Sequence, residues 1–169
     1  DPKTFHLSTD APVPLVEKFG HSRVRGTPIA EGALTGMGIG AAGSGFRPII
    51  DWRMITFSFV AMDQIVNQAS KIHYMFGGQT KFPILYRATV GGGVRMAAQH
   101  SQSPYSMFMN LAGLKMILPS TPYDTKGLLK TAIRDDNPVI SFESTRLLTM
   151  QGPVPEEDYT IPLGVADIK

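Results

Sequence analysis

The chain is organised around one stretch, Gly26-Thr27-Pro28-Ile29-Ala30-Glu31, and the glycine-rich run that follows it. Thr27 and Pro28 predict a helix start, because a threonine oxygen can cap the first turn and proline loses no useful N–H there. We therefore expect a helix over about residues 28–44. Glu31 would project from its first turn, one position too late to serve as the usual capping-box acid of Thr27. Helix capping alone therefore does not explain an acid at this place.

Three glycines in this helix share one face. Gly32, Gly36 and Gly40 recur every four residues, which places them in one row along the helix. Each costs about 1 kcal/mol relative to alanine in a helix interior. Three in one row therefore indicate a close contact with another element. A packed core helix explains the spacing, and so does a helix that approaches a neighbouring subunit.

The composition is that of an ordinary globular chain of 169 residues, 43% hydrophobic and 18% charged. This length fits one domain with a real core. A net charge of +2 without a lysine or arginine run gives no basic field of the kind that nucleic-acid binders use. No apolar stretch approaches the roughly 18 residues that a membrane span requires. The absence of cysteine excludes disulfides, a thiolate nucleophile and zinc–sulfur sites.

Two further kinds of site are excluded by position. The four histidines are scattered without metal-ligand spacing, which argues against a transition-metal site. Gly36, Gly38 and Gly40 resemble part of a dinucleotide fingerprint, but they lie inside the predicted helix and not in a strand-to-helix turn. No Gly-Lys-Ser/Thr loop for phosphate is present. The sequence therefore offers no diphosphate site of its own.

Apolar runs and helix-start signals alternate along the chain. We expect strands at residues 4–8, 45–50, 82–87, 114–118 and 138–142, and helices at residues 15–19, 28–44, 60–76, 103–113 and 121–134. This alternation, without hairpin signals, predicts a doubly wound, mostly parallel α/β sheet. Ligands of such sheets lie beyond the carboxyl ends of the strands. We expect the segments before Glu31, after Met54 and through His100 at that edge.

Several motifs follow one another in order. They are Thr27-Pro-Ile-Ala-Glu31, the 57–64 stretch with Asp63-Gln64-Ile-Val-Asn67, Ala97-Ala-Gln-His100-Ser-Gln102, Pro119-Ser-Thr-Pro-Tyr-Asp-Thr-Lys126 and Ala132-Ile-Arg-Asp-Asp-Asn-Pro138. Together they resemble the beta subunit of the thiamine-diphosphate-dependent 2-oxo acid dehydrogenases, of pyruvate, branched-chain and acetoin types. The resemblance implies a pyrimidine-binding domain, transketolase-like in fold, over residues 1–150. Residues 151–169 would then be an irregular exit segment toward a C-terminal domain that is absent here.

The resemblance also implies roles for three residues. Glu31 falls on the glutamate that contacts N1′ of the cofactor's aminopyrimidine, which helps the thiazolium C2 to lose its proton. Phe57 falls on the aromatic residue that lies against the aminopyrimidine. His100 falls on the histidine that serves the later steps at the intermediate. A lone loop histidine is otherwise more often simply solvated.

Ions and partners follow from the same resemblance. A structural K⁺ would be bound mostly through main-chain carbonyls at Ile84, Ala132, Ile133, Asp135 and Asn137. The alternative for these residues is a plain helix end followed by a turn, which Asp-Asp-Asn-Pro satisfies unaided. Mg²⁺ would be held mainly by an alpha subunit through a Gly-Asp-Gly motif that this sequence lacks. Expected partners are that alpha subunit, a second beta subunit in an alpha2-beta2 assembly and a lipoyl acyltransferase core, in a bacterial cytoplasm or mitochondrial matrix.

One departure keeps two alternatives open. Thr9 stands where the resemblance expects an acid near the cofactor pocket, and the segment over residues 8–14 is short. One alternative is a transketolase-like enzyme of another thiamine diphosphate branch. The other is a catalytically silent scaffold, against which the presence of Glu31, Phe57 and His100 counts. The sequence does not choose among pyruvate, branched-chain and acetoin-type substrates.

Overall fold

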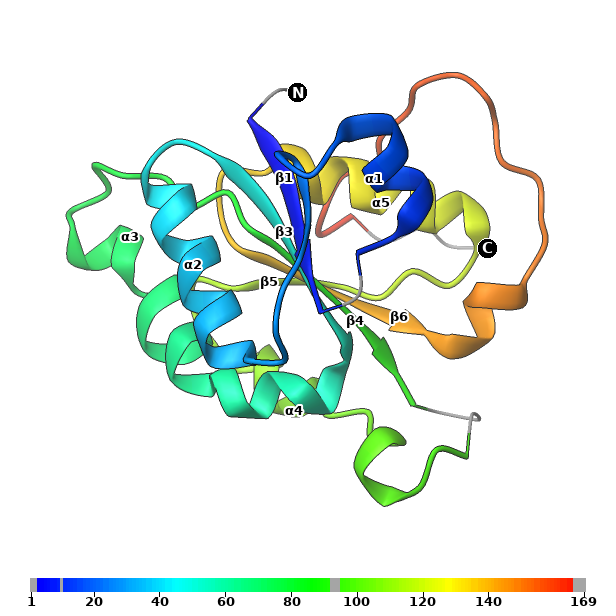
Figure 1. Ribbon diagram of the computed structural model, residues 1–169, viewed down its shortest axis with the longest axis horizontal. Coiled ribbons are helices and arrows are strands. Elements are labelled where there is room, and N and C mark those ends of the chain that lie inside the picture. Colours follow the sequence, from blue (N-terminus) through cyan, green and yellow to red (C-terminus); the bar gives the residue numbers. More distant parts are fainter. Residues whose placement is uncertain (1–2, 10, 92–94, 166–169) are drawn as a thin grey trace.

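The computed structural model describes residues 3–9, 11–91 and 95–165, which form one α/β layer structure (Figure 1). Its sheet has six parallel strands in the order β2-β1-β3-β4-β6-β5. The strands are β1 (Thr4–Ser8), β2 (Val24–Gly26), β3 (Arg47–Met54), β4 (Leu85–Val90), β5 (Lys115–Ile117) and β6 (Val139–Ser144). The expected doubly wound parallel fold is confirmed.

Helices flank the sheet on two sides, with α2 and α3 on one side and α1 and α5 on the other in Figure 1. The α-helices are α1 (Val13–Phe19), α2 (Glu31–Gly43), α3 (Ile72–Met75), α4 (Tyr105–Met109) and α5 (Pro122–Arg134). Tighter or wider helical turns are η1 (Ile55–Ala61), η2 (Gln64–Ala69), η3 (Ala98–His100) and η4 (Thr145–Thr149). Among the described residues, none of these helices is long and apolar enough to span a membrane.

The strand order reverses beside the first strand. β1 pairs with β2 on one side and with β3 on the other, and the chain visits β2 before it reaches β3. A reversal of this kind opens a crevice outside the carboxyl ends of the neighbouring strands. The crevice therefore lies outside the carboxyl ends of β1 and β3, where Ser8 leads toward α1 and Met54 leads into η1.

The expected start of the first long helix is wrong. The N–H of Thr27 donates to Ser8 O at 2.9 Å, so Thr27 still extends the pairing of β2 with β1. α2 begins at Glu31 instead, with Ala30 as an N-cap that makes no side-chain hydrogen bond. The same reasoning is confirmed at α5, where Thr121 Oγ1 accepts from the N–H of Asp124 at 3.1 Å.

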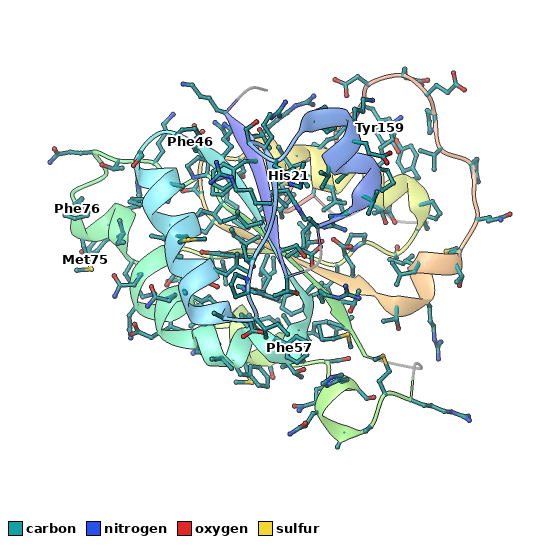
Figure 2. The ribbon with its side chains drawn as sticks, in the orientation of Figure 1. His21, Phe46, Phe57, Met75, Phe76 and Tyr159 are labelled. Atoms are coloured by element: carbon teal, nitrogen blue, oxygen red, sulfur yellow. The ribbon has the colours of Figure 1, made fainter. Side chains whose placement is uncertain are left out.

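The expected continuous helix over residues 60–76 is also wrong. The chain forms the 3₁₀ helix η1, the π-helix η2 and the single turn α3 in succession. At the end of η2 the N–H of Ser70 donates to Ile65 O at 3.1 Å, the spacing of a π turn. Figure 2 shows this run from Phe57 at the lower edge of the sheet to Met75 and Phe76 at its far tip. The expected helix over residues 103–113 is likewise shorter, because α4 covers only Tyr105–Met109 with Pro104 as its N-cap.

The glycine row of α2 faces elements of the same chain. A Cβ on Gly32 would lie 3.6 Å from Val60 O of η1, and one on Gly36 would lie 3.3 Å from the Gln64 side chain of η2. A Cβ on Gly40 would meet nothing within 4 Å. The tightest place is Gly38, outside the row, where a Cβ would come within 2.7 Å of Ile50 Cδ1. The expected close contact is therefore real, and Gly32 and Gly36 make theirs with η1 and η2 of the same chain.

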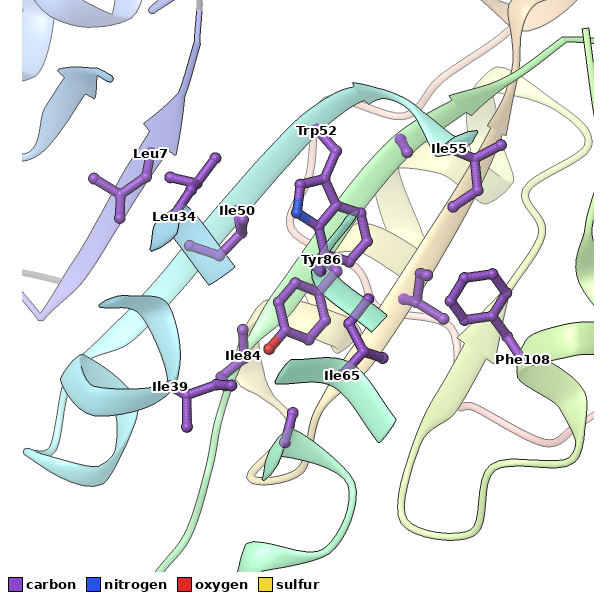
Figure 3. Packing of buried hydrophobic residues seen from close by; sticks show 14 of the residues in the cluster. Leu7, Leu34, Ile39, Ile50, Trp52, Ile55, Ile65, Ile84, Tyr86 and Phe108 are labelled. Carbon is purple, nitrogen blue, oxygen red and sulfur yellow. The ribbon is translucent and has the colours of Figure 1, made fainter. Parts of the chain in front are cut away.

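The main core lies between the sheet and the α2 side (Figure 3). Trp52 stacks on Tyr86 with ring centroids 4.8 Å apart and planes 8° apart. The Trp52 indole N–H donates to Thr35 Oγ1 of α2 at 2.9 Å, so the helix is fixed to the sheet by a buried polar contact as well as by packing. The other large buried side chains of this core include Leu7, Leu34, Ile39, Ile50, Ile55, Ile65, Ile84 and Phe108.

The opposite face of the sheet is apolar near α5 and charged toward the carboxyl ends of the strands. Because side chains alternate along a strand, Arg87 and Glu143 lie on the face opposite Tyr86 and Phe142. Arg87 donates two hydrogen bonds to Glu143, at 2.7 and 2.6 Å, and its Nη1 lies 3.8 Å from Asp51 Oδ2. Burial alone would raise the pKa of Asp51, but the His6 ring, the Arg53 N–H and the Arg87 charge outweigh it and lower this pKa.

Candidate active site

The first candidate residue, Glu31, follows β2 at the carboxyl edge of the sheet. It is the first residue of α2 and only 7% of it is exposed. The first turn of α2 rests on η1, since a Cβ on Gly32 would stand 3.6 Å from Val60 O. No residue in the described part of the chain hydrogen-bonds to the Glu31 carboxylate. The carboxylate oxygens themselves are not fully buried, so solvent or a ligand can reach them.

Phe57 and His100 lie in contact although they are distant in sequence. Phe57 belongs to η1 and His100 ends η3. Their ring centroids are 5.1 Å apart and their planes meet at 84°, an edge-to-face contact. The structure therefore brings two of the three predicted site residues together. Glu31 joins them through η1, which packs against both α2 and η3.

Unsatisfied polar atoms gather around these residues. Buried side-chain atoms without a hydrogen-bond partner include His100 Nδ1, Ser101 Oγ, Thr56 Oγ1 and Thr27 Oγ1, half of the eight such atoms in the described residues. Thr56 precedes Phe57, Ser101 follows His100, and Thr27 lies in the connection to Glu31. Native structures leave few buried polar atoms unpaired, and a ligand or ordered water usually accounts for them. Hydroxyl groups and an imidazole nitrogen can donate to or accept from a polar ligand.

A strand irregularity directs Phe57 into the site. The pairing of β3 with β4 shifts register between Asp51 and Met54. Asp51 Oδ1 accepts from the N–H of Arg53 at 2.8 Å, and Thr89 Oγ1 donates to Arg53 O at 2.6 Å. Arg53 has φ +65°, which a non-glycine residue adopts only under constraint. This local turn ends the strand and begins η1, which carries Phe57.

Gly91 places His100, and the sequence reasoning did not single it out. A Cβ on Gly91 would lie 2.3 Å from His100 O and 2.2 Å from Ser101 Cα, so no side chain fits there. The Gly91 N–H also donates to Gln102 O at 3.3 Å. The loop that leaves β4 therefore returns onto the end of its own strand. Its only signal in the sequence was its place in the glycine-rich stretch between the predicted strand over residues 82–87 and His100.

A separate cleft of about 780 Å³ opens on the charged face of the sheet. Asp51, Arg87 and Glu143 line it together with the short segment that leads from Ser8 into α1. Glu31, Phe57 and His100 do not line it. Thr9, which stands where an acid was expected, lies next to Ser8 and is partly buried.

The residues predicted for K⁺ meet at the opposite edge of the sheet. Ile84 directly precedes β4, Ala132 and Ile133 end α5, and Asp135 and Asn137 form the turn before β6. Four of these five carbonyls have protein donors. Ile84 O accepts from Val139 N at 2.8 Å, and Ala132 O accepts from Asp135 N at 3.3 Å. Arg47 Nη1 donates to Ile133 O at 3.3 Å and to Asp135 O at 3.0 Å. No group of three or more His, Asp or Glu side chains that could hold a metal occurs in the described residues.

The fold defines a class of protein, an α/β domain with a six-stranded parallel sheet and a candidate ligand site at its carboxyl edge. Residues 7–151 match the family model "Transketolase, pyrimidine binding domain", and the chain belongs to this family. Similar proteins that are named as beta subunits confirm the resemblance that the motifs indicated. The chain is 50% identical over 155 residues to the acetoin:2,6-dichlorophenolindophenol oxidoreductase subunit beta of Bacillus subtilis (strain 168), over 92% of the chain and 45% of that protein.

Two further comparisons agree. The 2-oxoisovalerate dehydrogenase subunit beta of the same organism is 49% identical over 156 residues, 92% of the chain and 48% of that protein. A solved structure described as "Split gene transketolase, inactive beta4 tetramer" has a TM-score of 0.69 at 21% identity, over 85% of the chain and 46% of that structure. At this identity the last comparison shows the fold alone. The chain spans about half the length of the curated relatives it matches.

Proposed function

We propose that this chain supplies the pyrimidine-binding half of a thiamine-diphosphate-dependent 2-oxo acid dehydrogenase. One observation carries the proposal: Glu31, of which only 7% is exposed and whose carboxylate has no hydrogen-bond partner in the described residues, shares an edge of the sheet with the Phe57–His100 pair. Relatives near 50% identity that are beta subunits of such enzymes support it.

Each residue has a role in this proposal. Glu31 holds a proton at N1′ of the aminopyrimidine through a carboxylate that no described residue occupies. Phe57 packs against the face of the same ring and fixes its orientation. When bound, thiamine diphosphate supplies the nucleophilic carbon and the electron sink for loss of CO₂. His100, held against Phe57, acts as proton donor or acceptor in the later transfer to an acceptor.

The other half of the site belongs to a partner in this proposal. Mg²⁺ favours carboxylate, carbonyl and phosphate oxygens in octahedral geometry, and the sequence contains no Gly-Asp-Gly motif that would supply them. An alpha subunit would therefore hold Mg²⁺ and the diphosphate, with a second beta subunit and a lipoyl acyltransferase core completing the assembly. The two relatives compared above are named for different substrates at nearly equal identity, so the 2-oxo acid or acetoin-type substrate stays open. The compartment, bacterial cytoplasm or mitochondrial matrix, also stays a prediction.

The test is exchange of the cofactor C2 proton in the complete complex. Chain and alpha subunit are assembled with thiamine diphosphate and Mg²⁺, and exchange into D₂O is followed by NMR after rapid quenching. Glu31→Gln should slow exchange by about 10²-fold or more, because a positioned proton-transfer group contributes that much. Glu17→Gln, the same chemical change on the exposed side of α1, should leave the rate unchanged.

Exchange at the wild-type rate in Glu31→Gln would remove Glu31 from this role. If the wild-type complex does not bind thiamine diphosphate, the result would instead favour a catalytically silent scaffold. Calorimetry with thiamine diphosphate separates these two results.

A further inference from the structure

The carboxyl end of α5 is surrounded by cationic side chains from three other elements. Lys115 of β5 lies 2.6 Å from Asp135 Oδ2, and Lys81, in the segment before β4, lies 2.6 Å from Asp136 Oδ2. Arg47 at the start of β3 lies 2.5 Å from Asp136 Oδ1. Three positive charges therefore meet two carboxylates at this helix end.

Arg47 differs from the two lysines because it also reaches the main chain. Its Nη1 donates to Ile133 O at 3.3 Å and to Asp135 O at 3.0 Å. The last carbonyls of a helix lack partners within the helix and carry the negative end of its dipole. A guanidinium is always charged and presents several N–H groups in a fixed plane, so it can satisfy two carbonyls and a carboxylate together. Arg47, whose side chain is 26% exposed, does all three.

These carbonyls include two of those that the resemblance assigns to K⁺. A K⁺ ion at a helix end would neutralise the same partial charges that the Arg47 guanidinium already neutralises. The Asp135 carboxylate, the only anionic side chain of the assigned set, accepts from Lys115 Nζ at 2.6 Å and from the Asn137 N–H at 2.9 Å. A further cation would enter a place where three are already fixed, and like charges at such distances repel.

We propose that Arg47 is the structural cation of this turn and replaces K⁺ at the carbonyls of Ile133 and Asp135. The fold of this chain then does not depend on K⁺. Removing the guanidinium should make the fold depend on K⁺, because the carbonyls of Ile133 and Asp135 would remain without a cation. The proposal rests on the turn alone and is independent of the cofactor chemistry at the other edge of the sheet.

The test is thermal unfolding of the full chain in KCl and in choline chloride at equal ionic strength. The wild-type midpoint should agree within about 1 °C in the two salts. Arg47→Met should unfold several degrees lower in choline and recover most of this loss in KCl. A site filled a hundredfold above its Kd raises the midpoint of a chain this size by roughly 5–10 °C. Arg134→Met removes an arginine at the same helix end that pairs with Asp158 and touches no described carbonyl, so it should show no salt difference.

Three outcomes would overturn the proposal. The first is a saturable K⁺-specific rise in the wild-type midpoint, which would mean that the ion binds with Arg47 in place. The second is an equal loss for Arg47→Met in both salts, which would make Arg47 an ordinary packing residue. If Arg47→Met does not fold in either salt, Arg47→Lys takes its place: it should gain more from KCl than the wild type does, and equal midpoints in the two salts would overturn the proposal.

Discussion

Adding one methyl group to Gly38 should loosen the contact between α2 and the sheet. The Cβ of Gly38→Ala would lie 2.7 Å from Cδ1 and 2.9 Å from Cγ1 of Ile50, which is fully buried in the centre of the sheet. Either α2 or the isoleucine must move. Overpacking of this kind costs about 1–3 kcal/mol. Alanine's better helix propensity returns about 1 kcal/mol, so the net destabilisation is at most about 2 kcal/mol.

Gly40→Ala is the matched control in the same helix. No atom lies within 4 Å of its Cβ position, and the residue is exposed, so only the gain in helix propensity remains. The free energies of unfolding of the two variants should therefore differ by about 1–3 kcal/mol, measured by urea titration. Ile50→Val removes Cδ1, the closer of the two contacted atoms, and should restore most of the loss when it is combined with Gly38→Ala.

Equal stability of Gly38→Ala and Gly40→Ala would refute this reasoning, because it would mean that α2 can shift on the sheet without cost. The same would follow if Ile50→Val gave no rescue. A shift of α2 also moves Glu31 at its first turn, so Gly38→Ala should slow C2-proton exchange while Gly40→Ala should not.

Four other changes test separate parts of the structure. Thr35→Val leaves the buried indole N–H of Trp52 without its acceptor and should cost about 1–3 kcal/mol in urea unfolding, whereas Thr35→Ser keeps the oxygen and should cost less. His100→Ala should slow transfer to a lipoyl acceptor more than decarboxylation assayed with an artificial oxidant, and equal losses would assign the histidine to an earlier step. Gly91→Ala should affect the same transfer step, because its methyl would displace the His100 carbonyl from 2.3 Å. The pKa of Asp51 is lowered in the folded state, so its contribution to the free energy of unfolding is complete above about pH 4 and is lost as the pH falls through the folded pKa. In urea titrations at a series of pH values, Asp51→Asn should therefore lose less stability on acidification than the wild type does.

The order of strands and helices could be predicted from the sequence because apolar runs and turn residues are local signals. The start of α5 at Thr121-Pro122 was predicted correctly, whereas the same pair of residue types at Thr27 and Pro28 was not. The difference is tertiary: the chain at Thr27 still follows β2, since its N–H donates to Ser8 O of the neighbouring strand, and nothing near Thr27 in the sequence reports this. Tertiary pairing of this kind overrides local helix signals.

The site was predictable only in part. Glu31 was conspicuous as an acid that capping did not explain, but Phe57 and His100 were indicated by resemblance alone. Their contact depends on the register shift at the end of β3 and on the close approach at Gly91, neither of which leaves a periodic signal. Periodicity found the glycine row of α2. The glycine of this helix with the closest neighbour, Gly38, lies outside that row because it faces the sheet.

The π-helix η2 constrains how this family can gain or lose residues. A π turn holds one residue more than an α turn, so a single deletion within Gln64–Ala69 would let the segment close as an ordinary α-helix. The helical residues that follow it, those of α3, would then rotate by about 100° around the helix axis. Tyr74, Met75 and Phe76, which are now 87%, 70% and 57% exposed at the tip of this run, would turn toward new neighbours. Relatives that lack one residue here are therefore expected to differ in these three side chains as well.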